Sequence, residues 1–172
     1  MSSHYPEQEI LQSTKGGFIF LSLIGALILN LLPAQGILLI LRPDFVALIV
    51  LYWSINQPHR VGISIAFGMG LLMDFSNISV LGQHAMAYCI VTYLTLTFYR
   101  RLRIFNSFQQ APQIGFILVF MQLIILFTGL LSGANFPGWH FFLMSMTGML
   151  IWPLVCFVLG VLQRPRNDPN AL

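Results

Sequence analysis

The sequence predicts an all-α integral membrane protein with six short transmembrane helices and with both termini in the cytoplasm. Of its 172 residues, 57% are hydrophobic and 8% are charged, against about 25% charged residues in an ordinary soluble domain. The apolar residues form several runs of near-spanning length rather than single faces of amphipathic helices. Basic residues gather at alternate ends of these runs. We therefore expect one domain whose core lies inside the bilayer.

The first helix is predicted over residues 17–32, where an apolar run ends at Pro33. The head before it, residues 1–16, is polar and includes Glu7 and Glu9. The run follows a single lysine and lacks the small-residue cleavage site of a signal peptide. We therefore expect an uncleaved anchor that is preceded by a cytoplasmic segment.

The second helix is predicted to begin at Arg42-Pro43-Asp44 and to end at Gln57. Proline suits the first turn of a helix, and an aspartate beside it faces the positive end of the helix dipole. The apolar residues 37–41 are then expected to form an interfacial or partly inserted segment.

A tight turn at residues 58–60 separates the second helix from a third, predicted from Val61 to about Phe75. With about 13 to 15 residues each, these helices are about 20 to 23 Å long, shorter than the roughly 30 Å hydrocarbon core. A re-entrant hairpin is the alternative, but it would place Arg60 in lipid at a cost of at least about 2.5 kcal/mol. Two short full spans are therefore favoured.

Three more helices complete a membrane domain over residues 17–162, and residues 163–172 form a predicted cytoplasmic tail. A polar loop is expected at 106–111, before Pro112 opens the fifth span. The three spans are predicted at 80–99, from Pro112 to about Leu131, and at 139–162.

The basic residues indicate the orientation of the six spans. Cytoplasmic loops of membrane proteins carry an excess of lysine and arginine. With the N-terminus inside, seven basic residues lie in the cytoplasm and one lies outside. The tight cluster Arg100, Arg101 and Arg103 is interpreted as this topology signal, not as a surface for nucleic acid. The inside residues are Lys15, Arg60, Arg100, Arg101, Arg103, Arg164 and Arg166, and Arg42 lies outside.

Aromatic residues near the predicted helix ends fit the interfacial belts of membrane proteins. Trp152 lies too deep for this role, and with Pro153 it predicts either a packing kink or a kink that shapes a groove for a partner. The belt residues are Tyr52, Trp53, Phe98 and Tyr99 at the inner surface and Phe136 and Trp139 at the outer surface.

Small residues recur every fourth position on the third helix, at Gly62, Ala66 and Gly70, and the next step reaches Asp74. Residues four apart lie on one helix face, and small side chains there allow close helix packing in lipid. We expect a packing surface whose outer end carries Asp74, either partly hydrated or capping a neighbouring helix. A contact with a partner protein and a role in proton or substrate chemistry remain as alternatives.

The sequence predicts no enzyme, metal site or cofactor. Cys89 and Cys156 are isolated in apolar runs and are expected to be buried, reduced thiols. His84 could pair with Asp74, but such lone pairs are usually incidental, and no second catalytic motif accompanies this one. Three further polar residues, Thr92, Thr95 and Gln122, are expected to form hydrogen bonds between helices.

Six motifs in order resemble the MreD family of rod shape-determining membrane proteins, over about residues 15 to 163. Each motif alone is weak, and their order and spacing carry the resemblance, above all between Arg42 and Gly82. The motifs are RPD at 42–44, YW at 52–53, PHR at 58–60, GLLMD at 70–74, LG at 81–82 and WP at 152–153.

The resemblance implies a non-enzymatic scaffold in the bacterial inner membrane, acting in the machinery that elongates the peptidoglycan wall. The family's partners would be the periplasmic scaffold MreC, the actin-like MreB, and the polymerase RodA with its penicillin-binding transpeptidase. Its fold is similar to the substrate-binding subunits of energy-coupling-factor vitamin transporters, which supplies a transporter subunit as the alternative function. The sequence shows no rich polar lining for a vitamin.

The resemblance also suggests roles for particular residues. Arg42 and Asp44 would fix the outer start of the second helix, and Gly70 and Asp74 the outer end of the third, together presenting a surface to MreC. At the cytoplasmic face, His59 and Arg60 would contact MreB or membrane lipids.

Overall fold

The computed structural model describes residues 16–33, 35–36, 41–77 and 81–163. These residues form six α-helices and one 3-10 helix and no strand, as the sequence predicts for an all-helical chain. The helices are α1 (Gly16–Leu31), α3 (Phe45–Asn56), α4 (Ile63–Asn77), α5 (Gln83–Ile104), α6 (Ser107–Leu131), η1 (Trp139–Phe142) and α7 (Leu143–Gln163).

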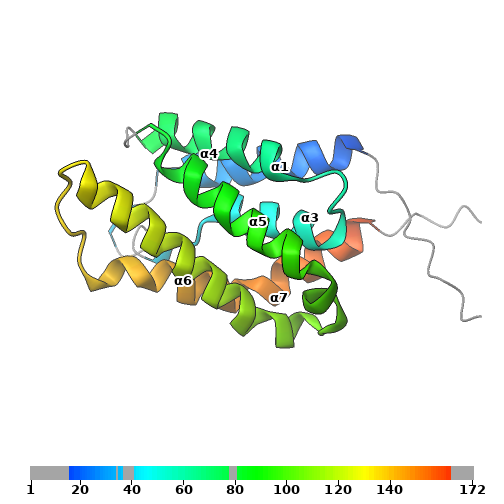
Figure 1. Ribbon diagram of the computed structural model, residues 1–172. Helices are drawn as coiled ribbons and strands as arrows, with labels where there is room; N and C mark the ends of the chain where they lie inside the picture. The colour runs from blue at the N-terminus through cyan, green and yellow to red at the C-terminus, as the bar shows by residue number, and fades with distance from the viewer. Residues whose placement is uncertain (1–15, 34, 37–40, 78–80, 164–172) are drawn as a thin grey trace, which may run out of the picture.

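The helices form one elongated bundle (Figure 1). In this view α1 and α4 lie along one edge, α6 and α7 along the other, and α3 and α5 between them. The start of α1 and the end of α7 lie at the same end of the bundle (Figure 1). An even number of passes along the bundle brings these two positions together.

Helix α3 is the centre of the fold, since it packs against α1, α4, α5 and α7. Nine of its 12 residues are buried. Its 12 residues span only about 18 Å, which is acceptable because protein rather than lipid surrounds the helix. The predicted aromatic belt is wrong for Tyr52 and Trp53, which are 5% and 0% exposed in this core. Trp53 donates a hydrogen bond from Nε1 to Oγ of Ser22 on α1, at 2.8 Å.

The outer helices direct large apolar side chains away from the core. Phe20 on α1, Phe116 on α6 and Phe157 on α7 are 66%, 75% and 69% exposed. Soluble monomers rarely leave so much apolar surface uncovered. Among the described residues, Ser107–Leu131 and Trp139–Gln163 are long and apolar enough to cross a membrane, and α1, α3 and α4 contain shorter apolar stretches.

The connection from α5 to α6 differs from its prediction. The expected polar loop at 106–111 is wrong, because α5 continues through the basic cluster to Ile104 and α6 begins at Ser107. Gln110 allows this tight joint by donating to the carbonyl oxygens of Leu102 and Phe105, at 3.0 and 2.9 Å. The joint thereby satisfies carbonyl groups that a helix end leaves unpaired.

Other helix ends move by a few residues from their predicted positions. The third helix begins at Ile63 and ends at Asn77, and the fourth begins at Gln83. The predicted interfacial segment 37–41 lies outside the described residues except for Leu41, as do nearly all residues of the predicted cytoplasmic head and tail.

Candidate functional site

Helices α4 and α5 approach closely at Gly70. A Cβ atom added to Gly70 would lie 2.4 Å from Cα of Ala85 and 2.6 Å from its backbone nitrogen. Only a glycine therefore fits without moving the two helices apart. The predicted close approach is present at Gly70, and Ala66 one turn earlier is fully buried. At Gly62 it is absent, since no atom lies within 4 Å of an added Cβ.

Asp74 caps the N-terminus of α5. Its Oδ2 accepts from the backbone N–H groups of Gly82 and Ala85, at 2.9 and 3.3 Å. Its Oδ1 accepts from the backbone N–H of His84 at 2.9 Å and lies 2.8 Å from His84 Nδ1. The expected partial hydration of Asp74 is wrong, because the residue is 1% exposed. The other expectation, that Asp74 caps a neighbouring helix, describes its position.

Gly82 supplies the turn that brings α5 onto this carboxylate. Its φ of 93° lies in the left-handed region, where a residue with a side chain is strained. The side chain of the N-cap residue is therefore missing, and Asp74 from the preceding helix takes its role. This accounts for the spacing between GLLMD and LG in the sequence.

Asp44 makes the matching cap at the start of α3. Its Oδ1 accepts from the backbone N–H of Ala47 at 3.0 Å and from Nδ2 of Asn30 at 2.9 Å. Its Oδ2 accepts from the Tyr88 hydroxyl at 2.5 Å. Pro43 precedes the cap instead of occupying the first helical turn, which corrects its predicted position. Asp44 thus joins α1, α3 and α5.

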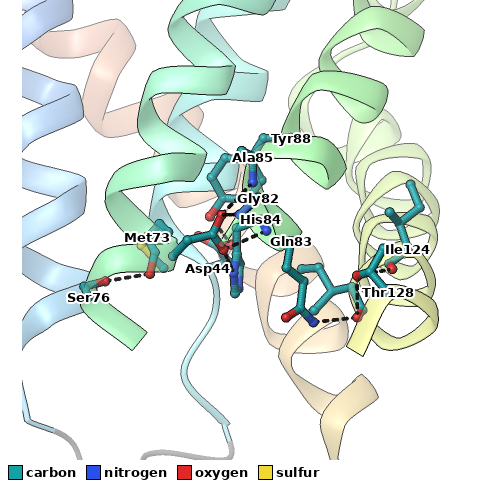
Figure 2. Close-up of polar contacts among 12 residues, drawn as sticks. Asp44, Met73, Ser76, Gly82, Gln83, His84, Ala85, Tyr88, Ile124 and Thr128 are labelled. Atoms are coloured by element: carbon teal, nitrogen blue, oxygen red, sulfur yellow. Dashed lines mark hydrogen bonds and ion pairs between the residues drawn. The ribbon is translucent and has the colours of Figure 1, made fainter. Parts of the chain in front are cut away.

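The two caps meet in one polar cluster, which we define as Asn30, Asp44, Asp74, His84 and Tyr88. Figure 2 shows Asp44, His84 and Tyr88 close together beside Gly82 and Ala85. The rings of His84 and Tyr88, one turn apart on α5, lie edge to face with centroids 6.2 Å apart. Beside the cluster is a cavity of about 140 Å³, lined by Asn30, Arg42, Pro43, Asp44, Met73, His84 and Met144.

The polar cluster has a structural role, since its two carboxylates hold helices of this chain together by hydrogen bonds. All four carboxylate oxygens of Asp44 and Asp74 accept hydrogen bonds from this chain. Such bonds offset the cost of burying the two charges. The Asp74–His84 pair is therefore not incidental, because it belongs to the cap of α5.

Arg42 secures the end of α1 next to the cluster. Its guanidinium donates to the carbonyl oxygens of Leu29 and Leu32, at 2.5 and 2.7 Å. These carbonyls belong to the last turn and end of α1, where the helix dipole favours a positive charge. Partial burial lowers the pKa of Arg42, and the nearby Asp44 carboxylate opposes that shift.

His59 and Arg60 lie far from the cluster, in the turn between α3 and α4. Both residues are exposed. A Cβ added to Gly16, at the start of α1, would lie 3.5 Å from Nη1 of Arg60. Arg60 and Arg42 are therefore found at opposite ends of α1.

Trp152 and Pro153 also lie apart from the cluster. Trp152 is fully buried, its Nε1 donates to Oε1 of Gln110 at 3.3 Å, and its ring centroid is 6.4 Å from that of Tyr52. Pro153 lies inside α7. These contacts give Trp152 a place in the core packing of α3, α6 and α7.

The polar residues predicted to link helices divide into two groups. Gln122 on α6 donates to the carbonyl oxygen of Phe141 at 2.9 Å and accepts from the Ser145 hydroxyl, so it does link helices. For Thr95 the prediction is wrong, since its hydroxyl donates to Val91 in its own helix. The buried Thr92 hydroxyl has no hydrogen-bond partner within the described part of the chain.

Sequence reasoning missed Asn30, Tyr88 and Gln83. Gln83 links the start of α5 to α6 by donating to the carbonyl oxygen of Ile125, at 2.6 Å. Each is a polar side chain inside or beside an apolar helix, which is itself a sign of a partner in another helix. Their partners come from distant segments, so the sequence alone does not pair them.

Comparisons with known proteins agree on one family. Residues 12–164 match the family model described as rod shape-determining protein MreD. The chain is 27% identical over 139 residues to the rod shape-determining protein MreD of Haemophilus influenzae, covering 81% of this chain and 86% of that protein. No solved structure matches the chain, so the predicted likeness to vitamin-transporter subunits stays a prediction.

Proposed function

This chain belongs to the MreD family of membrane proteins that determine rod shape, and we propose that it is a non-enzymatic scaffold which binds MreC in the bacterial inner membrane. Through MreC it helps to organise lateral peptidoglycan synthesis together with MreB, RodA and its penicillin-binding transpeptidase. The observation that carries this proposal is the polar cluster, whose carboxylates are all used to hold helices of this chain together.

The cluster stabilises one end of the bundle instead of offering reactive groups. Asp44 and Asp74 fix where α3 and α5 begin, and Arg42 fixes where α1 ends. Because these side chains are committed within the chain, we propose that they shape the MreC contact by positioning their helix ends. This revises the expectation that they form the contact surface directly.

We further propose six membrane crossings with both termini in the cytoplasm. The start of α1 and the end of α7 share one end of the bundle (Figure 1). Arg60 lies beside the start of α1, and Arg101 and Arg103 lie in the last turn of α5, which reaches that same end (Figure 1). Arg42 lies at the other end of α1. This distribution supports an inside with excess positive charge.

The position of Arg60 also favours two full passes over a re-entrant hairpin. The turn that carries Arg60 extends along the bundle as far as the start of α1. A hairpin that stopped midway would leave this turn at the middle of α1.

The transporter alternative receives less support. Helix α3 occupies the centre of the bundle, where Trp53 and Trp152 are both fully buried. Three larger cavities, of about 770, 640 and 440 Å³, have mostly apolar walls. A vitamin needs polar partners in an enclosed site.

Two experiments test the proposal. MreC should co-purify with the tagged full-length chain from detergent-solubilised membranes, and depletion of the chain should turn rod-shaped cells round. Depleted cells that remain rods but lose uptake of a vitamin would support the transporter subunit and overturn the scaffold.

A further inference from the structure

A long apolar groove separates α1 from α4, which lie along one edge of the bundle (Figure 1). Its volume is about 770 Å³. Every lining residue that the structure describes is apolar or glycine except Arg60, which stands at one end. The lining residues are Gly16, Ile19, Phe20, Leu23, Ile24, Leu27, Arg60, Ile65, Gly68, Met69 and Leu72.

The length of the groove suits one lipid chain. On α1 its lining extends from Gly16 to Leu27, which is about 17 Å at 1.5 Å per residue. One leaflet is half of the roughly 30 Å hydrocarbon core, or about 15 Å. A transmembrane helix of a partner would need a groove about twice as long, whereas an acyl chain ends at the bilayer midplane.

The charge in the groove lies where a lipid phosphate would be. The Arg60 side chain is beside Gly16, at the start of α1, so the cation marks one mouth of the groove. A guanidinium matches the geometry of phosphate oxygens and can bind two of them at once. From this complementarity we propose that the groove binds one anionic glycerophospholipid, with its phosphate on Arg60 and an acyl chain between α1 and α4.

A second groove provides the internal comparison. It lies between α1 and α7, has a volume of about 440 Å³, and has no charged residue among those described in its lining. Gly25 lines this groove as Gly68 lines the first. A Cβ added to either glycine meets no atom within 4 Å. Leucine at either position therefore fills its own groove without displacing a helix.

The proposal is tested by native mass spectrometry of the full-length chain, titrated with phosphatidylglycerol or phosphatidylcholine. Arg60→Gln should weaken binding of phosphatidylglycerol about fivefold, the effect of one cation near anionic lipid. It should weaken binding of phosphatidylcholine less, because the choline cation offsets the charge of the phosphate. Arg103→Gln is the matched control, because it removes an exposed charge that does not line the groove. Gly68→Leu should weaken both lipids, and Gly25→Leu should leave the Arg60-dependent binding intact.

Three results would overturn the proposal. Equal losses of phosphatidylglycerol binding in Arg60→Gln and Arg103→Gln would show that the lipid is attracted by the general positive charge of the protein surface and not by a site at Arg60. Unchanged binding in Gly68→Leu would show that the acyl chain lies elsewhere. If co-expressed MreC expelled the lipid and Gly68→Leu abolished MreC capture, the groove would belong to a protein helix. This site does not depend on MreC binding, so failure of the scaffold proposal leaves the first two tests unaffected.

Discussion

The Tyr88 hydroxyl lies 2.5 Å from Oδ2 of Asp44 and joins the second turn of α5 to the N-cap of α3. Tyr88 is 1% exposed, so its hydroxyl cannot exchange this partner for water. The other Asp44 oxygen caps α3 and accepts from Asn30. One carboxylate thus fixes the relative positions of three helices.

Tyr88→Phe should lower the free energy of unfolding by about 1.5 to 3 kcal/mol, the usual worth of a hydrogen bond to a charged group. The ring still fills the same space, so the loss reports on the hydroxyl. Unfolding by SDS in mixed micelles measures it. Tyr93→Phe is the control, because Tyr93 lies on the same helix and is 59% exposed. Equal losses of unfolding free energy in the two variants would contradict a stabilising role for the Tyr88–Asp44 hydrogen bond.

Gly70→Ala should destabilise the α4–α5 contact by about 1 to 3 kcal/mol or more, as overpacking does, because its Cβ would overlap the Ala85 backbone. Gly68→Ala adds the same methyl group to the same helix where no atom lies within 4 Å, and it should be neutral or mildly stabilising. Thermal unfolding in detergent compares the pair. A tolerated Gly70→Ala would contradict the close approach.

Asp74→Asn should loosen the start of α5. In the structure both oxygens accept from backbone N–H groups, so the amide NH₂ must face N–H donors on one side. Leaving a buried donor unpaired costs about 1 to 3 kcal/mol.

Hydrogen exchange at the first turn of α5 should measure this loss as faster exchange. Ser76→Ala serves as the control, since the Ser76 hydroxyl donates within its own helix to Met73. Unaltered exchange in Asp74→Asn would show that the cap does not hold α5.

The six-span topology predicts opposite labelling at two positions. In a background without Cys89 and Cys156, a single cysteine at Asn135 should react with an impermeant thiol reagent in intact spheroplasts. One at Asn106 should stay unlabelled until the membrane is opened. Both residues are exposed in loops or at a helix start, so reactivity depends on the side of the membrane. Labelling of the cysteine at position 106 alone would show that the orientation in the membrane is the opposite of the predicted one.

The local features of the chain were predictable because they depend on neighbouring residues. The start of α3 at Asp44 and the turn at residues 58–60 follow from capping and turn chemistry. The joint between α5 and α6 was not predicted, since Gln110 replaces a loop by reaching back to α5. Tyr52 and Trp53 were placed at an interface because their sequence position near a helix end does not reveal that α3 is enclosed.

The sequence alone was enough to predict the all-helical class, the apolar character, the family and the small-residue contact at Gly70. These follow from composition, periodicity and ordered motifs, which are local properties of the chain. The packing of the helices was needed to show that Asp44 and Asp74 share one cluster and that Asn30 and Tyr88 complete it. A side chain reaches only a few ångströms, so the partners of a buried carboxylate depend on how helices distant in sequence pack against one another.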